Sequence, residues 1–143
     1  MANLAELMKG RVEDLIKGPP TLPIGDYPAV ISKFELTSAR NAEQTPILRF
    51  TARILGWPAD DSIDESQKAP IENITQRTVN CDYWLPLDYR YGRLCAQCGI
   101  TGEITEQTNY ELVGKEVLAS VKHQISKKTG EVWAVAQQLI GTA

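Results

Sequence analysis

The amino-acid sequence predicts a single, mainly β domain. The clearest evidence is a regular alternation: the even-numbered positions from Leu48 to Ile54 are apolar, and Arg49, Thr51 and Arg53 lie between them. Successive side chains of a strand point to opposite faces, so this pattern indicates a strand with one buried and one solvated face. Four further segments have the composition of strands, and ten glycines and eight prolines are spread along the chain as turn residues.

The length and composition are those of one globular domain. The chain has 143 residues, of which 43% are apolar and 23% are charged. A chain of this size buries a substantial core, and its composition is not that of a disordered protein. The formal net charge is −3. The chain therefore lacks the strongly basic character that by itself indicates nucleic-acid binding, and any such function depends on local charge.

The sequence also predicts the compartment. Residues 1–16 are amphipathic and lack the apolar segment of a signal peptide. No apolar run approaches the ~20 residues of a membrane span. Three cysteines, an odd number, argue against a disulfide framework and suit a reducing environment. We therefore expect a cytoplasmic protein without membrane association.

Residues 3–17 are predicted to form a short helix. Apolar residues recur there at spacings of three and four, and charged residues fill the opposite face. A Gly-Pro-Pro sequence at 18–20 ends the helix. The chain is thus divided into a helix and linker at 1–20 and a β domain at 21–143. The helix is expected to pack on the β domain or on a partner.

The first two strands are predicted at 26–38 and 46–56, joined by a polar turn at 40–45. Residues 57–73 are rich in acidic side chains and are predicted to form a long solvated loop. A loop of this length in a compact domain is usually mobile or functional. Trp57, at its start, is expected to pack back on the core.

The third strand and a helix follow. In the predicted strand 75–85, Tyr83 and Trp84 are neighbours and therefore point to opposite faces, so at most one of them lies outside the core. Asp88 is the predicted N-cap of a helix that Gly99 ends. The apolar stripe of this helix consists of Tyr91, Leu94, Cys95 and Cys98.

A turn-rich segment at 100–108 leads to two further strands, 116–124 and 132–139, which a hairpin turn at 125–131 joins. Five strands with a helix between the third and the fourth follow the order of an OB-fold, a small, partly open Greek-key barrel. The predicted fold class is therefore mainly β: a five-stranded OB-fold barrel with an additional N-terminal helix.

Four segments also resemble a known family. They are GDYPAVISKFEL from Gly25, TPILRFTARILG from Thr45, YGRLCAQCGI from Tyr91 and YELVGKEVLASVKHQISKKTGEVW from Tyr110. Together they resemble a family of short bacteriophage OB-fold single-stranded-DNA-binding proteins, many of which are encoded near phage replication or recombination genes. The shared pattern includes a G-x-Y start to the first strand and an L-x-G-K-x-V lead into the fourth.

The resemblance implies sequence-nonspecific binding of single-stranded DNA during phage replication or recombination, without catalysis and without a cofactor. It implies the host-cell cytoplasm as the location. Phage replication or recombination proteins are implied as further partners, and a homo-oligomer is left open. Many such proteins recruit partners through an acidic C-terminal tail, whereas this chain ends in QQLIGTA.

Binding of a single strand requires cations for the phosphates and aromatic rings for base stacking, and no code for the base edges. The hairpin between the fourth and fifth strands is one that an OB-fold uses for binding. The competing interpretation is that the basic residues only solvate a sheet face and that the tryptophans belong to the core. The expected binding residues are Lys33, Arg49, Arg53, Arg77, Tyr83, Trp84, Lys122, Lys127, Lys128 and Trp133.

A structural zinc site is one alternative. Cys81, Cys95, Cys98 and His123 have the composition of a Cys₃His site. However, Cys95 and Cys98 lie three residues apart in a predicted helix, where cysteine also serves as a small apolar core residue.

Two other functions are less favoured by the sequence. Asp60, Asp61, Asp64 and Glu65 have the composition of a magnesium cluster for nuclease chemistry, although a solvated acidic loop is the simpler interpretation. With a single histidine and none of the common catalytic motifs, the chain is not expected to be an enzyme. A protein-interaction module is the main competitor, with the N-terminal helix or an open strand edge as its binding surface.

Overall fold

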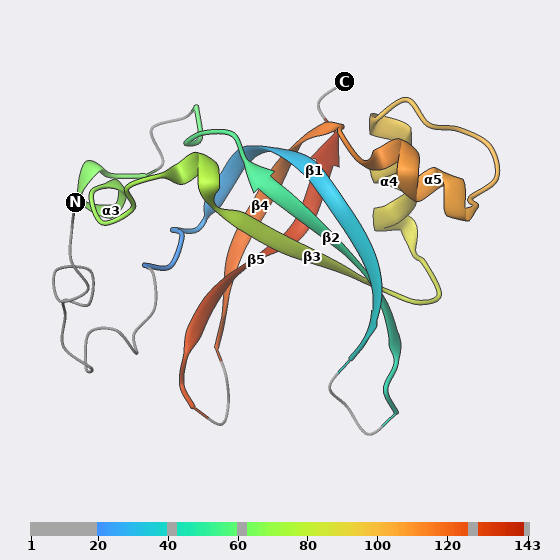
Figure 1. Cartoon of the computed structure of the whole chain (residues 1–143), viewed down its shortest axis with the longest axis horizontal. Coiled ribbons are helices and arrows are strands. Elements are labelled where there is room, and N and C mark those ends of the chain that lie inside the picture. Colours follow the sequence, from blue (N-terminus) through green and yellow to red (C-terminus); the bar gives the residue numbers. More distant parts are fainter. Residues whose placement is uncertain (1–19, 40–42, 60–62, 126–128, 142–143) are drawn as a thin grey trace, which may run out of the picture.

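The computed structural model describes residues 20–39, 43–59, 63–125 and 129–141. Five antiparallel strands form one sheet in the order β3-β2-β1-β4-β5 (Figure 1). The mainly β class is thereby confirmed. The predicted helix at 3–17 lies outside the described residues, so the division of the chain into 1–20 and 21–143 stays a prediction. The strands are β1 (Gly25–Ser38), β2 (Pro46–Ile54), β3 (Thr78–Trp84), β4 (Glu116–Ile125) and β5 (Val132–Gly141).

Two long hairpins, β1–β2 and β4–β5, extend from the body of the sheet toward the same side (Figure 1). We call their turn-proximal ends the two hairpin arms. In the first arm, Ser38 of β1 pairs with Pro46 of β2. In the second arm, Ile125 of β4 pairs with Val132 of β5. Because β1 also pairs with β4 over its first half, it lies at the centre of the sheet and holds both arms.

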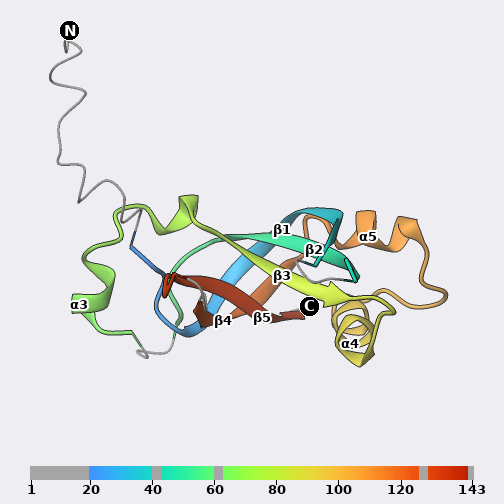
Figure 2. The ribbon, with the colours of Figure 1, turned by 90° about the horizontal axis from the view of Figure 1, so that it is seen from below.

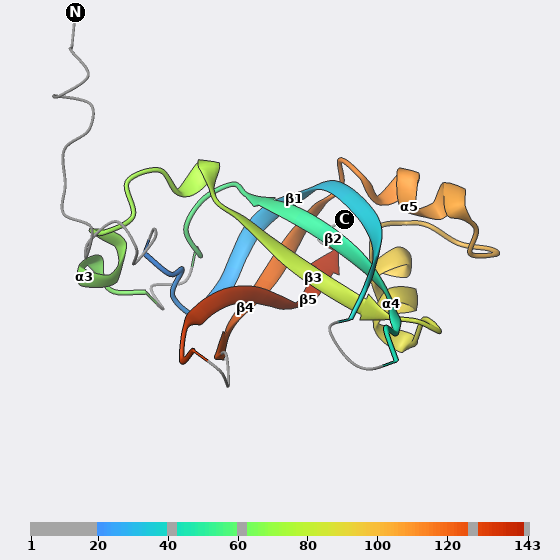
Figure 3. The same cartoon turned by 60° about the horizontal axis from the view of Figure 1, so that its bottom comes forward.

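The sheet is not a closed barrel. Within the described residues it ends at β3 on one side and at β5 on the other, and no ladder joins these two strands. They nevertheless lie side by side near the C-terminal end of β5 (Figure 3), where the Tyr83 hydroxyl hydrogen-bonds the backbone of Leu139. The predicted barrel is therefore open between β3 and β5.

One continuous core lies on the inner face of the sheet. As the alternation predicted, Leu48, Phe50, Ala52 and Ile54 of β2 are all buried. The opposite side of β2 is less solvated than expected, because Thr51 is also buried. The Thr51 hydroxyl is satisfied there by the side-chain oxygen of Asn80 on β3, at 2.9 Å.

The described part of segment 57–73 is mostly exposed, as predicted, but it is not wholly a solvated loop. Ile63 and Ile71 are buried in the core, and Asp64 begins a short helix, α3 (Glu65–Lys68), through a capping box with Gln67. The acidic composition of the segment gave no indication that these two isoleucines are buried. Trp57 packs on the core as expected, with its ring centroid 6.0 Å from that of Tyr27. A 3₁₀ turn, η1 (Ile74–Gln76), then delays the start of β3.

Two helices cover the other end of the sheet from α3 (Figure 2). The predicted helix is confirmed as α4 (Tyr89–Gln97), because the Asp88 side chain caps it and Tyr91, Leu94 and Cys95 are buried. A second helix, α5 (Glu106–Leu112), replaces the end of the predicted turn-rich segment. Its capping box uses two threonines in place of the more usual Ser/Thr and Glu pair, so its start was missed.

Among the described residues, no helix has the length and apolar character needed to cross a membrane.

The C-terminal end of β5 packs closely against α4 at Gly141 and Gln97, and this contact is testable. A Cβ atom on Gly141 would lie 2.6 Å from Gln97 Cβ and 2.8 Å from Gln97 C. Gly141→Ala is therefore expected to destabilise the fold by about 1–3 kcal/mol, as overpacking of a tight contact does. Urea unfolding measures the change. Gly56→Ala is the matched control, because a Cβ there meets nothing within 4 Å. Equal effects of the two substitutions would contradict the docking.

Buried hydroxyl and thiol groups make the fold sensitive to alkaline pH. Burial raises the pKa of the Cys81 thiol to about 11 and that of Tyr27 to about 12. Above about pH 9 the unfolded chain therefore binds fewer protons than the folded chain, and the free energy of unfolding falls as pH rises. The expected slope is at most about 1.4 kcal/mol per pH unit for each group.

Urea unfolding between about pH 7 and pH 10.5 tests this expectation. The variant Cys81→Val removes one of the titrating groups, so its stability should fall less steeply above about pH 9. A free energy of unfolding that does not change over this interval would show that these groups are not shielded from water.

Candidate functional site

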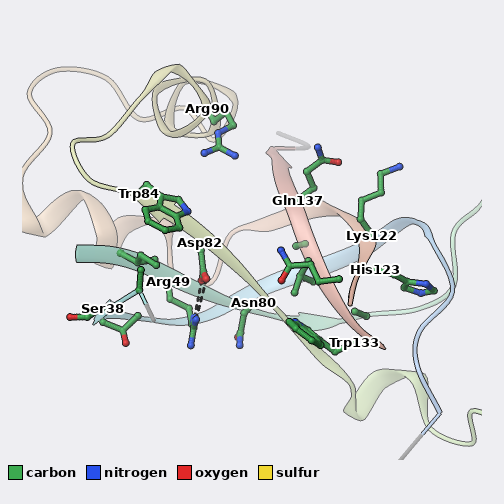
Figure 4. A pocket seen from close by; sticks show the side chains of 17 residues that line it. Ser38, Arg49, Asn80, Asp82, Trp84, Arg90, Lys122, His123, Trp133 and Gln137 are labelled. Atoms are coloured by element: carbon green, nitrogen blue, oxygen red, sulfur yellow. Dashed lines mark hydrogen bonds and ion pairs between the residues drawn. The ribbon is translucent and has the colours of Figure 1, made fainter. Parts of the chain in front are cut away.

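A groove with a volume of about 1060 Å³ lies between the two hairpin arms (Figure 4). One wall is formed by the end of β1 and the outer face of β2 and β3. The other wall is formed by the second arm, with side chains from β4 and β5. Arg90 of α4 completes the groove at the end nearest the helix. Strands that are distant in the sequence thus enclose one continuous surface.

Two tryptophans line this groove. Trp84 is 47% exposed and Trp133 is 43% exposed. Trp84 points outward because its neighbour Tyr83 is in the core, 2% exposed, and β3 is a regular strand at this point. Trp133 stands on the second arm, where it is paired with Gln124. In Figure 4 the two indole rings lie at different ends of the groove.

The groove is positively charged although the chain is acidic. Its charged lining residues are Arg49, Arg90, Lys122 and one carboxylate, Asp82. Its net charge is therefore +2 with His123 neutral, whereas that of the whole chain is −3. Two further carboxylates, Asp88 beside Arg90 and Glu35 beside Arg49, do not line the groove but act on its cations.

Arg49 and Asp82 form a two-point ion pair across β2 and β3. Arg49 Nε donates to Asp82 Oδ1 at 2.7 Å, and Arg49 Nη2 donates to Asp82 Oδ2 at 3.0 Å. The hydrogen bond to Asp82 raises the pKa of Arg49. Cross-strand register adds Glu35 of β1 to the same row. This arrangement fixes the Arg49 guanidinium on the groove wall, with one terminal nitrogen, Nη1, outside the pair.

Uncharged polar groups complete the surface. Asn80, held by the Thr51 hydroxyl, lies next to Asp82 along the outer face of β3, and Gln137 lies opposite on β5 (Figure 4). At the rim, His123 Nε2 lies 2.7 Å from the Leu22 carbonyl oxygen, which fixes the ring. These uncharged side chains can form hydrogen bonds with either donors or acceptors of a ligand.

Four predicted binding residues meet in this groove: Arg49, Trp84, Lys122 and Trp133. Trp84 and Trp133 are thus outside the core, contrary to the competing interpretation. Of the neighbours Tyr83 and Trp84, Tyr83 is the one in the core.

The other predicted residues do not line the groove. Tyr83 is buried and presents no ring to a ligand, because its hydroxyl and ring are used within the core. Lys33 and Arg53 are exposed on β1 and β2, outside the groove, and Arg77 is half-buried before β3. Lys127 and Lys128 lie outside the described residues.

Sequence reasoning missed Arg90, and it considered His123 only as a metal ligand. Arg90 lies in α4, and nothing in the local sequence pattern indicates that this helix reaches the groove. His123 is the single histidine, and its place on the second arm follows from the β4–β5 pairing. The position of Arg90 at the groove is revealed only by the packing of α4 against β3 and β5.

The zinc set is not assembled. Within the described part of the chain, no three histidine, cysteine or acidic side chains gather in a metal-binding geometry. Cys81 is a buried residue of β3, whereas the His123 ring is hydrogen-bonded to the Leu22 carbonyl oxygen at the rim of the groove. Burial raises the pKa of all three thiols and so favours the protonated form, which is not the metal-binding form.

The acidic segment gives no assembled cluster among the described residues either. Asp64 and Glu65 are exposed at the start of α3, where Asp64 caps the helix. Asp60 and Asp61 lie outside the described residues.

Comparison with known proteins found no family model that matches this sequence and no curated protein that is significantly similar to it.

Proposed function

We propose that this protein is an OB-like, non-catalytic binder of single-stranded DNA with little sequence preference. The observation that carries the proposal is the pairing, in one groove, of two half-exposed tryptophans with a net positive charge in an otherwise acidic chain. Trp84 and Trp133 supply faces on which bases stack, and Arg49, Arg90 and Lys122 supply cations for phosphates.

The topology supports the OB-like assignment. β1 is central, β2 and β3 follow it on one side and β4 and β5 on the other, with α4 and α5 inserted between β3 and β4. In OB-folds, oligonucleotides bind across the second and third strands and the two hairpin loops. The groove described above occupies this same position.

The chemistry of the groove suits a polymer of variable sequence. Stacking contributes about 1–3 kcal/mol per base and does not discriminate strongly among bases, because every base has a π-face. Phosphate contacts are likewise independent of sequence. The protein would cover transient single strands during phage replication or recombination, together with proteins of those processes, as the resemblance of its sequence implies.

Each groove tryptophan should contribute separately to binding. We expect Trp84→Ala and Trp133→Ala each to weaken binding to an oligo-dT strand about 5- to 150-fold, which corresponds to one lost stacking interaction. Fluorescence anisotropy of a labelled strand measures the dissociation constant. Trp57→Phe is the control, because this ring packs on Tyr27 and does not line the groove.

Intrinsic fluorescence gives a second measurement. The double variant Trp84→Ala/Trp133→Ala retains only Trp57 of the three tryptophans. Added DNA should therefore no longer quench the tryptophan emission of this variant. Wild-type affinity in either single variant would show that the groove is not the stacking surface.

Substitutions of the two partners of the Arg49–Asp82 pair should change DNA affinity in opposite directions. Arg49→Ala removes a cation and leaves the Asp82 carboxylate facing the phosphates, so binding should weaken and the salt slope should flatten by about 0.7. Asp82→Asn removes the carboxylate from the groove, so binding should tighten. Titrations at several salt concentrations measure both effects.

Arg53→Ala is the matched control, since Arg53 is an exposed arginine on the same strand but outside the groove. Its affinity should stay within about twofold of wild type. Equal losses for Arg49→Ala and Arg53→Ala would indicate general electrostatic attraction and would sink the groove assignment.

One observation favours a protein-interaction module instead. Leu36 on the first arm is 70% exposed and Ile125 on the second arm is 65% exposed, and exposed apolar side chains are common at protein interfaces. A gel shift with single-stranded DNA at low and moderate salt, with duplex DNA and RNA as competitors, separates the two functions. Only the DNA-binding function predicts a gel shift that increasing salt reverses.

A further inference from the structure

A second, smaller cavity adjoins the groove at Arg90. It has a volume of about 100 Å³ and lies between α4 and the C-terminal half of β5. Tyr89 and Arg93 of α4 line it, as does Gln138 of β5. Arg90 lines both this cavity and the groove. A single guanidinium therefore belongs to two adjacent surfaces.

Tyr89 and Arg93 form an exposed pair on α4. They are four residues apart in a helix and so lie on the same face. The Arg93 guanidinium carbon lies 4.8 Å from the centroid of the Tyr89 ring, and Tyr89 is 66% exposed. Among the described residues, Arg93 forms no ion pair. The charge of Arg93 is thus available, and the ring is oriented by a cation rather than by the core.

Arg90 connects this pair to the groove. Its Nε faces the Asp88 carboxylate at 3.3 Å, which leaves its two terminal nitrogens outside that pair. Its guanidinium also lies 5.8 Å from the centroid of the Tyr83 ring. In Figure 4 the side chain extends from α4 toward the groove, on the side of Trp84. A phosphate at Arg90 would therefore lie between the two surfaces.

We propose that a bound DNA strand continues past Trp84 and Arg90 over α4, where a further base stacks on Tyr89 and a phosphate lies at Arg93. The inference rests on the proposed function and extends its site from the sheet to the helix. Tyr89 and Arg93 together provide the ring and the cation that single-strand binding requires, in a place that the sheet does not reach.

Strand length tests the proposal. The double variant Tyr89→Ala/Arg93→Ala is compared with wild type on oligo-dT of about 6 and about 16 nucleotides, near the limits of the site sizes known for one OB-fold. We expect at least about a fivefold loss of affinity for the long strand, and a flatter salt slope. For the short strand, which the groove alone accommodates, we expect a change of less than about twofold.

Arg53→Ala/Tyr110→Ala is the matched control, because it removes the same two side-chain types from exposed positions outside both cavities. It should bind both strands as wild type does, and circular dichroism verifies that each variant is folded. Equal losses on the two strands, or no loss on either, would overturn the extension over α4. Failure of the wild-type protein to bind either strand would overturn the proposed function itself, and the extension with it.

Discussion

Three aromatic rings pack together where the sheet meets α4. Tyr83 of β3 meets Phe50 of β2 edge-to-face at 5.7 Å and Tyr91 of α4 edge-to-face at 5.8 Å. Phe50 and Tyr91 also contact each other, at 6.2 Å. Such pairs each contribute about 0.5–1.5 kcal/mol beyond the burial of their area. The cluster joins the sheet to α4, and burial raises the pKa of both tyrosine hydroxyls.

Two features of the groove follow from this cluster. Because the Tyr83 ring is buried, Trp84 must point to the opposite face of β3, where it lines the groove. Because Tyr91 anchors α4 to the same ring, Arg90, one residue earlier in the helix, lies close to the end of that groove. One packing arrangement in the core thus places both an exposed indole ring and a cation at the groove.

The charge of the groove lining differs in sign from that of the whole chain. Acidic side chains such as Asp64 and Glu65 are exposed around α3, at the end of the sheet away from α4 and α5, whereas the groove carries three cations and one carboxylate. The Arg49–Asp82 pair is about one-third exposed on each side, so its contribution to stability is small. Its effect is to hold the Arg49 guanidinium on the groove wall.

The strands, the sidedness of β2 and β3, and the capped helix α4 could be predicted from the sequence alone, because these depend on alternation and on residues close together in the chain. The sequence placed Arg49, Trp84, Lys122 and Trp133 on strands with the correct orientation. It missed α5 and the buried anchors Ile63 and Ile71, whose signals are short or masked by acidic neighbours. The tertiary structure was needed to show that β3 and β5 approach each other and that α4 brings Arg90 to the groove. It also left Arg53 outside, since which exposed residues share a groove depends on contacts between distant strands that no local pattern encodes.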